Sequence, residues 1–157
     1  MNKKTILLPL LFALFLSMAS AFTQQIAAAG EKWNLDYEAA SKTAKAEHKP
    51  ILMVFGGSDW CKPCIMLRKE VWESEAFKRY AADNLVLVEL DFPRLKKNQL
   101  PAEQVQQNEA LAARYNKQGV FPLVVLTDEY GKVLATTGYQ AGGPEKYIEH
   151  LNTLLQH

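Results

Sequence analysis

The chain has 157 residues, with 18 basic and 17 acidic side chains and a formal net charge of +1. A chain of this length suits one domain with a hydrophobic core of its own. The nearly balanced charge argues against a nucleic-acid partner.

Residues 1–21 are predicted to be a cleaved signal peptide. Two lysines give a charged start, residues 6–18 are almost wholly apolar, and Ala19-Ser20-Ala21 is an A-x-A cleavage signal. The alternative is a membrane anchor, but the apolar stretch is shorter than the ~20 residues of a spanning helix. We therefore expect a protein that is periplasmic or secreted after cleavage near Ala21.

The remaining chain is expected to be a lead-in followed by one domain. Residues 22–32 are small and polar, which predicts a flexible segment, and the alanines at 27–29 offer a second cleavage site. Residues 33–157 then form the predicted domain.

Apolar runs and helical periodicity divide this domain into alternating strands and helices. Asp36 and Ser74 are predicted helix N-caps, and Gly131 is predicted to take a positive φ in a hairpin. The alternation, which ends in that hairpin, predicts a three-layer α/β/α domain with a mixed central sheet of four to five strands. In chain order we expect a strand at 33–35, a helix at 37–47, a strand at 51–55, a helix that breaks near 73, a short helix to 80, a strand at 85–92, a helix at 102–116, strands at 123–127 and 132–136, and a last helix that opens at 143–144.

The helical patterns also predict which side chains face the core. In the helix after the cysteines, Leu67 and Val71 are expected to point inward and Arg68 outward. In the long helix at 102–116, the expected inward side chains are Val105, Leu111 and Tyr115.

The polar connector at 93–101 carries Arg94, Lys96 and Lys97. Three charges are too few to indicate a dedicated anion site. We therefore expect an ordinary solvated loop.

The only two cysteines of the chain stand in the stretch Trp60-Cys61-Lys62-Pro63-Cys64, between a predicted strand and a predicted helix. A thiol attacks a disulfide only as thiolate, and the N-terminus of a helix favours that anion. Cys61 is therefore expected to be an exposed nucleophile, and Cys64, one turn further in, to resolve the mixed disulfide. Pro63 fits the first helical turn, and Lys62 is expected to help lower the pKa of the Cys61 thiol.

Three other readings of the pair remain open. A zinc site needs about four ligands, and the chain has neither a second cysteine pair nor histidines at ligand spacing. An inert structural disulfide would close so short a loop that it removes little entropy from the unfolded chain. A Cu(I) binding or delivery protein could use the same thiolates, with Met53 and Met66 close in sequence.

The stretch Trp60-Cys61-Lys62-Pro63-Cys64, together with Val120-Phe121-Pro122 before a later strand, resembles the active site of the thioredoxin family, whose usual pattern is Trp-Cys-Gly-Pro-Cys. The resemblance covers residues 33–155. It implies a thioredoxin fold and a thiol–disulfide oxidoreductase that uses no cofactor beyond the Cys61–Cys64 disulfide. It also implies that Pro122 is cis and faces the cysteines, that Phe121 offers backbone groups to a substrate chain, and that Trp60 forms an apolar rim.

The sequence departs from the family at the proton acceptor of the resolving cysteine. Many thioredoxins have a buried aspartate in the strand before the cysteines, where this chain has Met53-Val54-Phe55. Asp59 is expected to be too exposed to replace it. Glu89, in the adjacent strand, is the better candidate, because a buried carboxyl would have a raised pKa and could shuttle a proton. The alternative is that Glu89 faces solvent or pairs with a surface lysine.

The resemblance leaves the direction of electron flow open. Pro63 matches the reducing thioredoxins, whereas Lys62 replaces their glycine. We expect a monomeric reductase rather than an oxidase, with protein or peptide disulfides as substrates and electrons from a membrane-bound donor.

Overall fold

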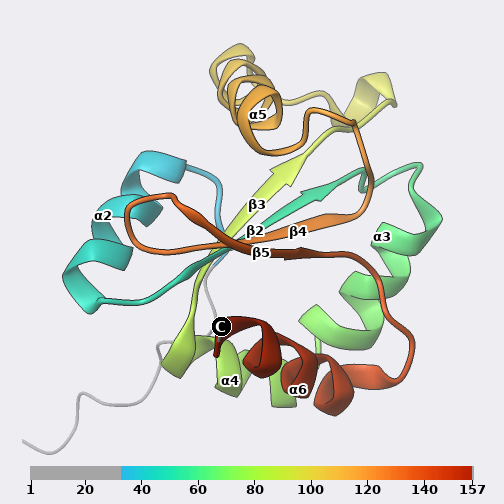
Figure 1. The fold of residues 1–157 in the computed structure, drawn as a ribbon. Coiled ribbons are helices and arrows are strands. Elements are labelled where there is room, and N and C mark those ends of the chain that lie inside the picture. Colours follow the sequence, from blue (N-terminus) through green and yellow to red (C-terminus); the bar gives the residue numbers. More distant parts are fainter. Residues whose placement is uncertain (1–32, 157) are drawn as a thin grey trace, which may run out of the picture.

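The computed structural model describes residues 33–156, so the predicted signal peptide and lead-in lie outside the described residues. A central sheet carries helices on both of its faces (Figure 1). Its strands are β1 (Trp33–Asn34), β2 (Ile51–Gly56), β3 (Val86–Asp91), β4 (Leu123–Thr127) and β5 (Val133–Thr137). The helices are α2 (Tyr37–Glu47), α3 (Lys62–Leu67), α4 (Glu75–Asn84), α5 (Ala102–Tyr115) and α6 (Gly143–Leu155), with a π-helical turn η1 (Arg68–Trp72) and a 3₁₀ turn η2 (Lys96–Asn98).

The sheet is mixed, with five strands in the order β1-β3-β2-β4-β5. β1 and β2 both run parallel to β3, whereas β4 is antiparallel to β2 and β5 is antiparallel to β4. Because β2 lies inside the sheet and is covered on both faces, its residues 51–55 are all buried, as the continuous apolar run predicts. The predicted three-layer α/β domain is confirmed.

Alternation along the strands divides the core in two. Leu52 and Val54 of β2 pack with residues of η1, α4 and α6 on one face of the sheet. Ile51, Met53 and Phe55 pack on the other face, against α2 and α5. In β3, Leu87 belongs to the first face, so Glu89, two residues further along, also projects toward the side that carries α3.

The predicted N-caps and hairpin are confirmed. The Asp36 carboxylate accepts hydrogen bonds from the Glu38 and Ala39 N–H groups, and the Ser74 side chain accepts one from the Phe77 N–H. Gly131 has a φ of 82° between β4 and β5.

Two local expectations are wrong. The second short helix does not end at residue 80 but continues to Asn84, because Phe77 and Ala81 form one buried face, four residues apart, that extends past that point. In α5, Val105 is 38% exposed, and the buried side chains are Asn108 and the predicted Leu111. The Asn108 amide is satisfied there, since it donates to the Asp91 carbonyl at 2.9 Å and accepts from Gln104.

Candidate active site

Cys61 and Cys64 lie at the carboxyl end of β2, where the chain turns into α3. The two cysteines form a disulfide, with their Cα atoms 5.2 Å apart. Cys61 is the N-cap of α3, and its Sγ accepts the Cys64 N–H at 3.3 Å. Pro63 occupies the first turn, as expected. The strand-to-helix placement therefore puts an N–H donor directly on the Cys61 sulfur.

The exposure of the two cysteines is the reverse of the expected one in this disulfide form. Cys61 is only 4% exposed, whereas Cys64 is half-buried and lines a pocket. The Cys61 sulfur is bonded to the Cys64 sulfur and also accepts the Cys64 N–H. Lys62, next to it, is exposed.

The turn before the cysteines is held by the last residue of β3. Asp91 accepts hydrogen bonds from the Ser58 N–H at 2.8 Å and the Ser58 hydroxyl at 2.6 Å. The Phe92 N–H donates to the Gly56 carbonyl at 2.9 Å. Because β2 and β3 are parallel neighbours, their carboxyl ends meet at one edge of the sheet, which brings these loops together. Sequence reasoning missed Asp91, although its place at the end of a predicted strand was a usable signal.

Asp59 fixes the loop after β3 to the same turn. Its carboxylate accepts the Arg94 N–H at 3.0 Å, the Leu95 N–H at 2.9 Å and the Asn98 side-chain amide at 3.0 Å. These hydrogen bonds, the one from Arg94 first, lower the pKa of Asp59 below its usual value, because they favour the ionised form. Asp59 is therefore ionised, and its lowered pKa makes it a weaker proton acceptor than an ordinary carboxylate.

Trp60 lies in an aromatic cluster beside the disulfide. Its indole N–H donates to the Phe92 carbonyl at 2.8 Å, and its ring meets the Phe121 ring edge-on at 5.4 Å between centroids. The Phe121–Pro122 bond is cis, as predicted. Gly57 makes room for this arrangement, since a Cβ there would lie 2.4 Å from the indole. The structure thus brings Trp60 and Phe121, two of the predicted substrate-binding residues, into contact.

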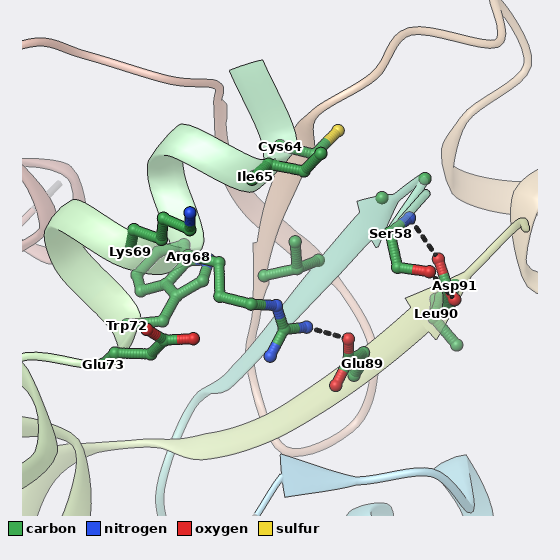
Figure 2. A pocket seen from close by; sticks show the side chains of 13 residues that line it. Ser58, Cys64, Ile65, Arg68, Lys69, Trp72, Glu73, Glu89, Leu90 and Asp91 are labelled. Carbon is green, nitrogen blue, oxygen red and sulfur yellow. Dashed lines mark hydrogen bonds and ion pairs between the residues drawn. The ribbon is translucent and has the colours of Figure 1, made fainter. Parts of the chain in front are cut away.

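Glu89 faces a pocket of about 100 Å³ that is also lined by Cys64 and Arg68 (Figure 2). Figure 2 shows the Arg68 guanidinium directed at the Glu89 carboxylate, with which it forms an ion pair. Burial raises the pKa of Glu89 above its usual value, and the positive charge of Arg68 opposes that rise. Glu89 is neither fully exposed nor paired with a lysine; its partner is an arginine from the cysteine helix.

The expectation that Arg68 points outward is wrong. Arg68 is four residues after Cys64, so it lies on the face of the helix that looks into the pocket. Its carbonyl accepts the Glu73 N–H at 2.9 Å, which closes the wider π-helical turn of η1. The spacing from Cys64 was the signal that sequence reasoning overlooked.

The comparisons with known proteins agree with this site. Residues 37–155 match the family model described as a thioredoxin-like domain. The chain belongs to the thioredoxin-like family. It is 41% identical over 134 residues to the disulfide bond reductase DsbH of Chlamydia pneumoniae, covering 85% of this chain and 78% of that protein. A solved structure of DsbH oxidoreductase, also 41% identical, superimposes with a TM-score of 0.75 and covers 85% of this chain and 90% of the other.

Two further proteins are similar to this chain over only part of their length or in fold alone. The thioredoxin-related protein DsbJ of Chlamydia pneumoniae is 35% identical over 131 residues, but the match spans 79% of this chain and only 37% of DsbJ. A thioredoxin from Thermus thermophilus, 16% identical, has a TM-score of 0.59 over 80% of this chain and 88% of its own, and shows the shared fold alone. Together with the Cys61–Cys64 disulfide, the family match makes this thioredoxin-like chain a thiol:disulfide oxidoreductase.

Two observations on the described part of the chain concern the metal alternatives. Within residues 33–156, no group of three or more histidine, cysteine, aspartate or glutamate side chains is placed to hold a metal ion. Met53, one of the two methionines near the motif, is fully buried in the core on the α2 face of the sheet. No helix in this range is long and apolar enough to span a bilayer.

Proposed function

We propose that this thioredoxin-like protein is an exported disulfide reductase in which Cys61 attacks and Cys64 resolves. The observation that supports the choice of Cys61 is the Cys64 N–H that its Sγ accepts at the N-terminus of α3. An N–H donor and the positive end of a helix stabilise a thiolate on Cys61 more than one on Cys64. The exposed ammonium of Lys62 adds to this stabilisation in the reduced protein.

The proposed reaction passes two electrons from the dithiol to the substrate. The Cys61 thiolate attacks one sulfur of a substrate disulfide, which forms a mixed disulfide and releases the other sulfur as a thiolate. The Cys64 thiol loses its proton and attacks the Cys61 sulfur. This step frees the second substrate thiolate and leaves the Cys61–Cys64 disulfide that the structure contains. No cofactor beyond this disulfide is required.

Glu89 is the proposed acceptor of the Cys64 proton. It lines the same pocket as Cys64, and its raised pKa brings it closer to the range in which a carboxylate can take up a proton and return it. Arg68 is a positioning residue, because its ion pair holds the Glu89 carboxylate on the pocket wall.

Trp60 and the backbone of Phe121 are the proposed contacts for the substrate chain, since they lie together beside the disulfide. The substrates are proteins or peptides with accessible disulfides. A reductase in an oxidising compartment must be re-reduced, so we propose a membrane-bound dithiol donor as the second partner.

The reductase direction is tested by equilibrating the protein with mixtures of reduced and oxidised glutathione. A reductase is expected to stay oxidised until the buffer is strongly reducing, with a potential close to the roughly −270 mV of thioredoxin. A potential near the roughly −120 mV of a strong oxidant would contradict the proposal. A Cu(I) titration of the reduced protein tests the metal-binding alternative separately.

A further inference from the structure

We propose that the rim beside the disulfide selects disulfide substrates with acidic residues next to the cystine, and that Arg94 is the group that binds them. The inference rests on the proposed function, because it concerns which chains reach Cys61.

Arg94 lies against an aromatic ring of the active site. Its guanidinium carbon is 3.6 Å from the centre of the Trp60 ring. Trp60 directly precedes Cys61, and its ring also meets the Phe121 ring edge-on. A substrate chain that lies along Trp60 and Phe121 is therefore within reach of the Arg94 charge.

The backbone that carries Arg94 is fixed to the turn that carries the cysteines. Three hydrogen bonds join the Asp59 carboxylate to Arg94, Leu95 and Asn98. A fourth joins the Trp60 indole to the Phe92 carbonyl. Although the loop is exposed, as the sequence predicts, it is held in place at four points, and a binding group that is already ordered loses less entropy when a ligand arrives.

Arg94 also keeps its ability to bind an anion. A guanidinium stacked on an aromatic face leaves its in-plane N–H groups available for a carboxylate. The Asp59 carboxylate, in the turn before the cysteines, accepts N–H donors that include the Arg94 backbone but not its guanidinium. The geometry thus leaves a forked donor at the rim, which matches a carboxylate better than any neutral or basic side chain.

Three more exposed cations lie in the segments that carry Cys61 and Arg94. Lys62 follows Cys61 in α3, and Lys96 and Lys97 lie in η2, all of them exposed. Within residues 33–156, no carboxylate forms an ion pair with these lysines or with Arg94. The sequence argument that three loop charges are too few for an anion site overlooked Lys62 and the stacking of Arg94 on Trp60. The unpaired positive charge favours an acidic partner.

Three cystine-bridged peptides that differ only in the residues flanking the cystine test the inference. These residues are glutamate, glutamine or lysine, and the second-order rate constant for single-turnover reduction of each peptide by the pre-reduced protein is measured at low and high salt. Exposed charge pairs are worth about 1.4- to five-fold each, and several cations contribute, so we expect the glutamate peptide to be reduced about ten-fold more efficiently than the lysine peptide at low salt. Salt is expected to shrink this ratio, because it screens exposed charges.

Variants at Arg94 assign the effect. Arg94→Gln is expected to lower the glutamate-to-lysine ratio about three-fold, and Arg94→Lys to give an intermediate ratio, because it keeps the charge but loses the planar fork. Arg79→Gln, which removes an exposed cation from α4, is the matched control and should leave the ratio unchanged. The glutamine peptide corrects for any loss common to all substrates.

Different results would overturn the inference, the role of Arg94 and the proposed function. Efficient but equal reduction of all three peptides overturns the inference and leaves the reductase function intact. A ratio that Arg94→Gln does not change overturns the role of Arg94. Failure to reduce any of the peptides overturns the proposed function, and the inference falls with it.

Discussion

Glu89 and Arg68 carry the part of the site that differs most from the family pattern. Glu89 can accept a proton only when it is ionised, and its pKa lies above the usual value because it is partly buried. Turnover limited by the Cys64 step should therefore fall as the pH drops through the raised pKa of Glu89.

The Glu89→Gln variant should remove this acidic limb of the pH profile. We expect turnover near neutral pH to fall at least about ten-fold. The fall should be smaller than the roughly 10²–10⁴-fold contributed by a typical general base, because solvent reaches the half-buried pocket and can also accept the proton. The measurement is single-turnover formation of the Cys61–Cys64 disulfide between pH 4 and 8. An unchanged limb in Glu89→Gln would show that another group accepts the proton.

Arg68→Gln gives the complementary prediction. Removing the positive partner should raise the pKa of Glu89 further, because Arg68 opposes the effect of burial. The acidic limb should then move to higher pH. Lys69→Gln is the matched control, since the adjacent lysine is exposed and makes no ion pair with Glu89. A limb that moves equally in both variants would contradict the specific role of Arg68.

Gly57 is predicted to be essential for the position of Trp60. In Gly57→Ala the new Cβ would lie 2.4 Å from the indole, so the ring has to move. Forcing an extra methyl group into a packed site costs about 1–3 kcal/mol, and we expect a similar loss of stability with a changed tryptophan fluorescence.

Gly56→Ala provides the control for this variant. A Cβ at Gly56 would lie 3.9 Å from the Cys64 Cβ, which is ordinary contact. Equal losses of stability and activity in Gly56→Ala and Gly57→Ala would mean that the Trp60 contact is not the cause.

Helix α2 lies on the face of the sheet opposite α3, and its start depends on Asp36. The Asp36 carboxylate accepts two N–H groups at 2.8 and 3.1 Å, so Asp36→Ala should lower the free energy of unfolding by about 1 kcal/mol. Because α2 packs on the other face of the sheet from α3, disulfide reduction by the folded variant should be unchanged. Urea titration measures both effects, and Asp83→Ala, at an exposed position in α4, should leave the free energy of unfolding unaltered.

The π-helical turn η1 shows which local structure the sequence does not reveal. The inward positions of Leu67 and Val71 follow from helical spacing, and both are fully buried. The wider turn that begins at Arg68 has no comparable signal, because it depends on how α3 meets the sheet rather than on the residues within it. Asn108 in α5 is a similar case, since its burial depends on a carbonyl of β3 that the helix pattern does not contain.

The order of strands and helices across the domain could be predicted from the sequence, whereas the partners within the site could not. Apolar runs such as residues 51–55 and the cysteine motif have local signatures. The pairing of Glu89 with Arg68 also requires the register of the sheet, in which Val54 of β2 lies beside Glu89 of β3. The meeting of the loops after these strands follows from their parallel arrangement, and this is how Arg94 comes to lie on Trp60.

The reaction proposed for the whole molecule depends on which cysteine attacks the substrate. Exposure in the disulfide form favours Cys64, since Cys61 is only 4% exposed. The electrostatics of the helix N-terminus favours Cys61. These two arguments lead to opposite expectations, so one measurement can separate them.

Trapping of the mixed disulfide is that measurement. Reduced Cys64→Ala and reduced Cys61→Ala are each mixed with a cystine-bridged peptide, and the covalent adduct is followed by intact-protein mass spectrometry. The double variant, which lacks both cysteines, gives the background rate of adduct formation. We predict that Cys64→Ala forms the adduct through Cys61 at least about ten-fold faster than Cys61→Ala forms one through Cys64, in line with the larger thiolate fraction expected at a helix N-terminus. Faster adduct formation through Cys64 would contradict the account.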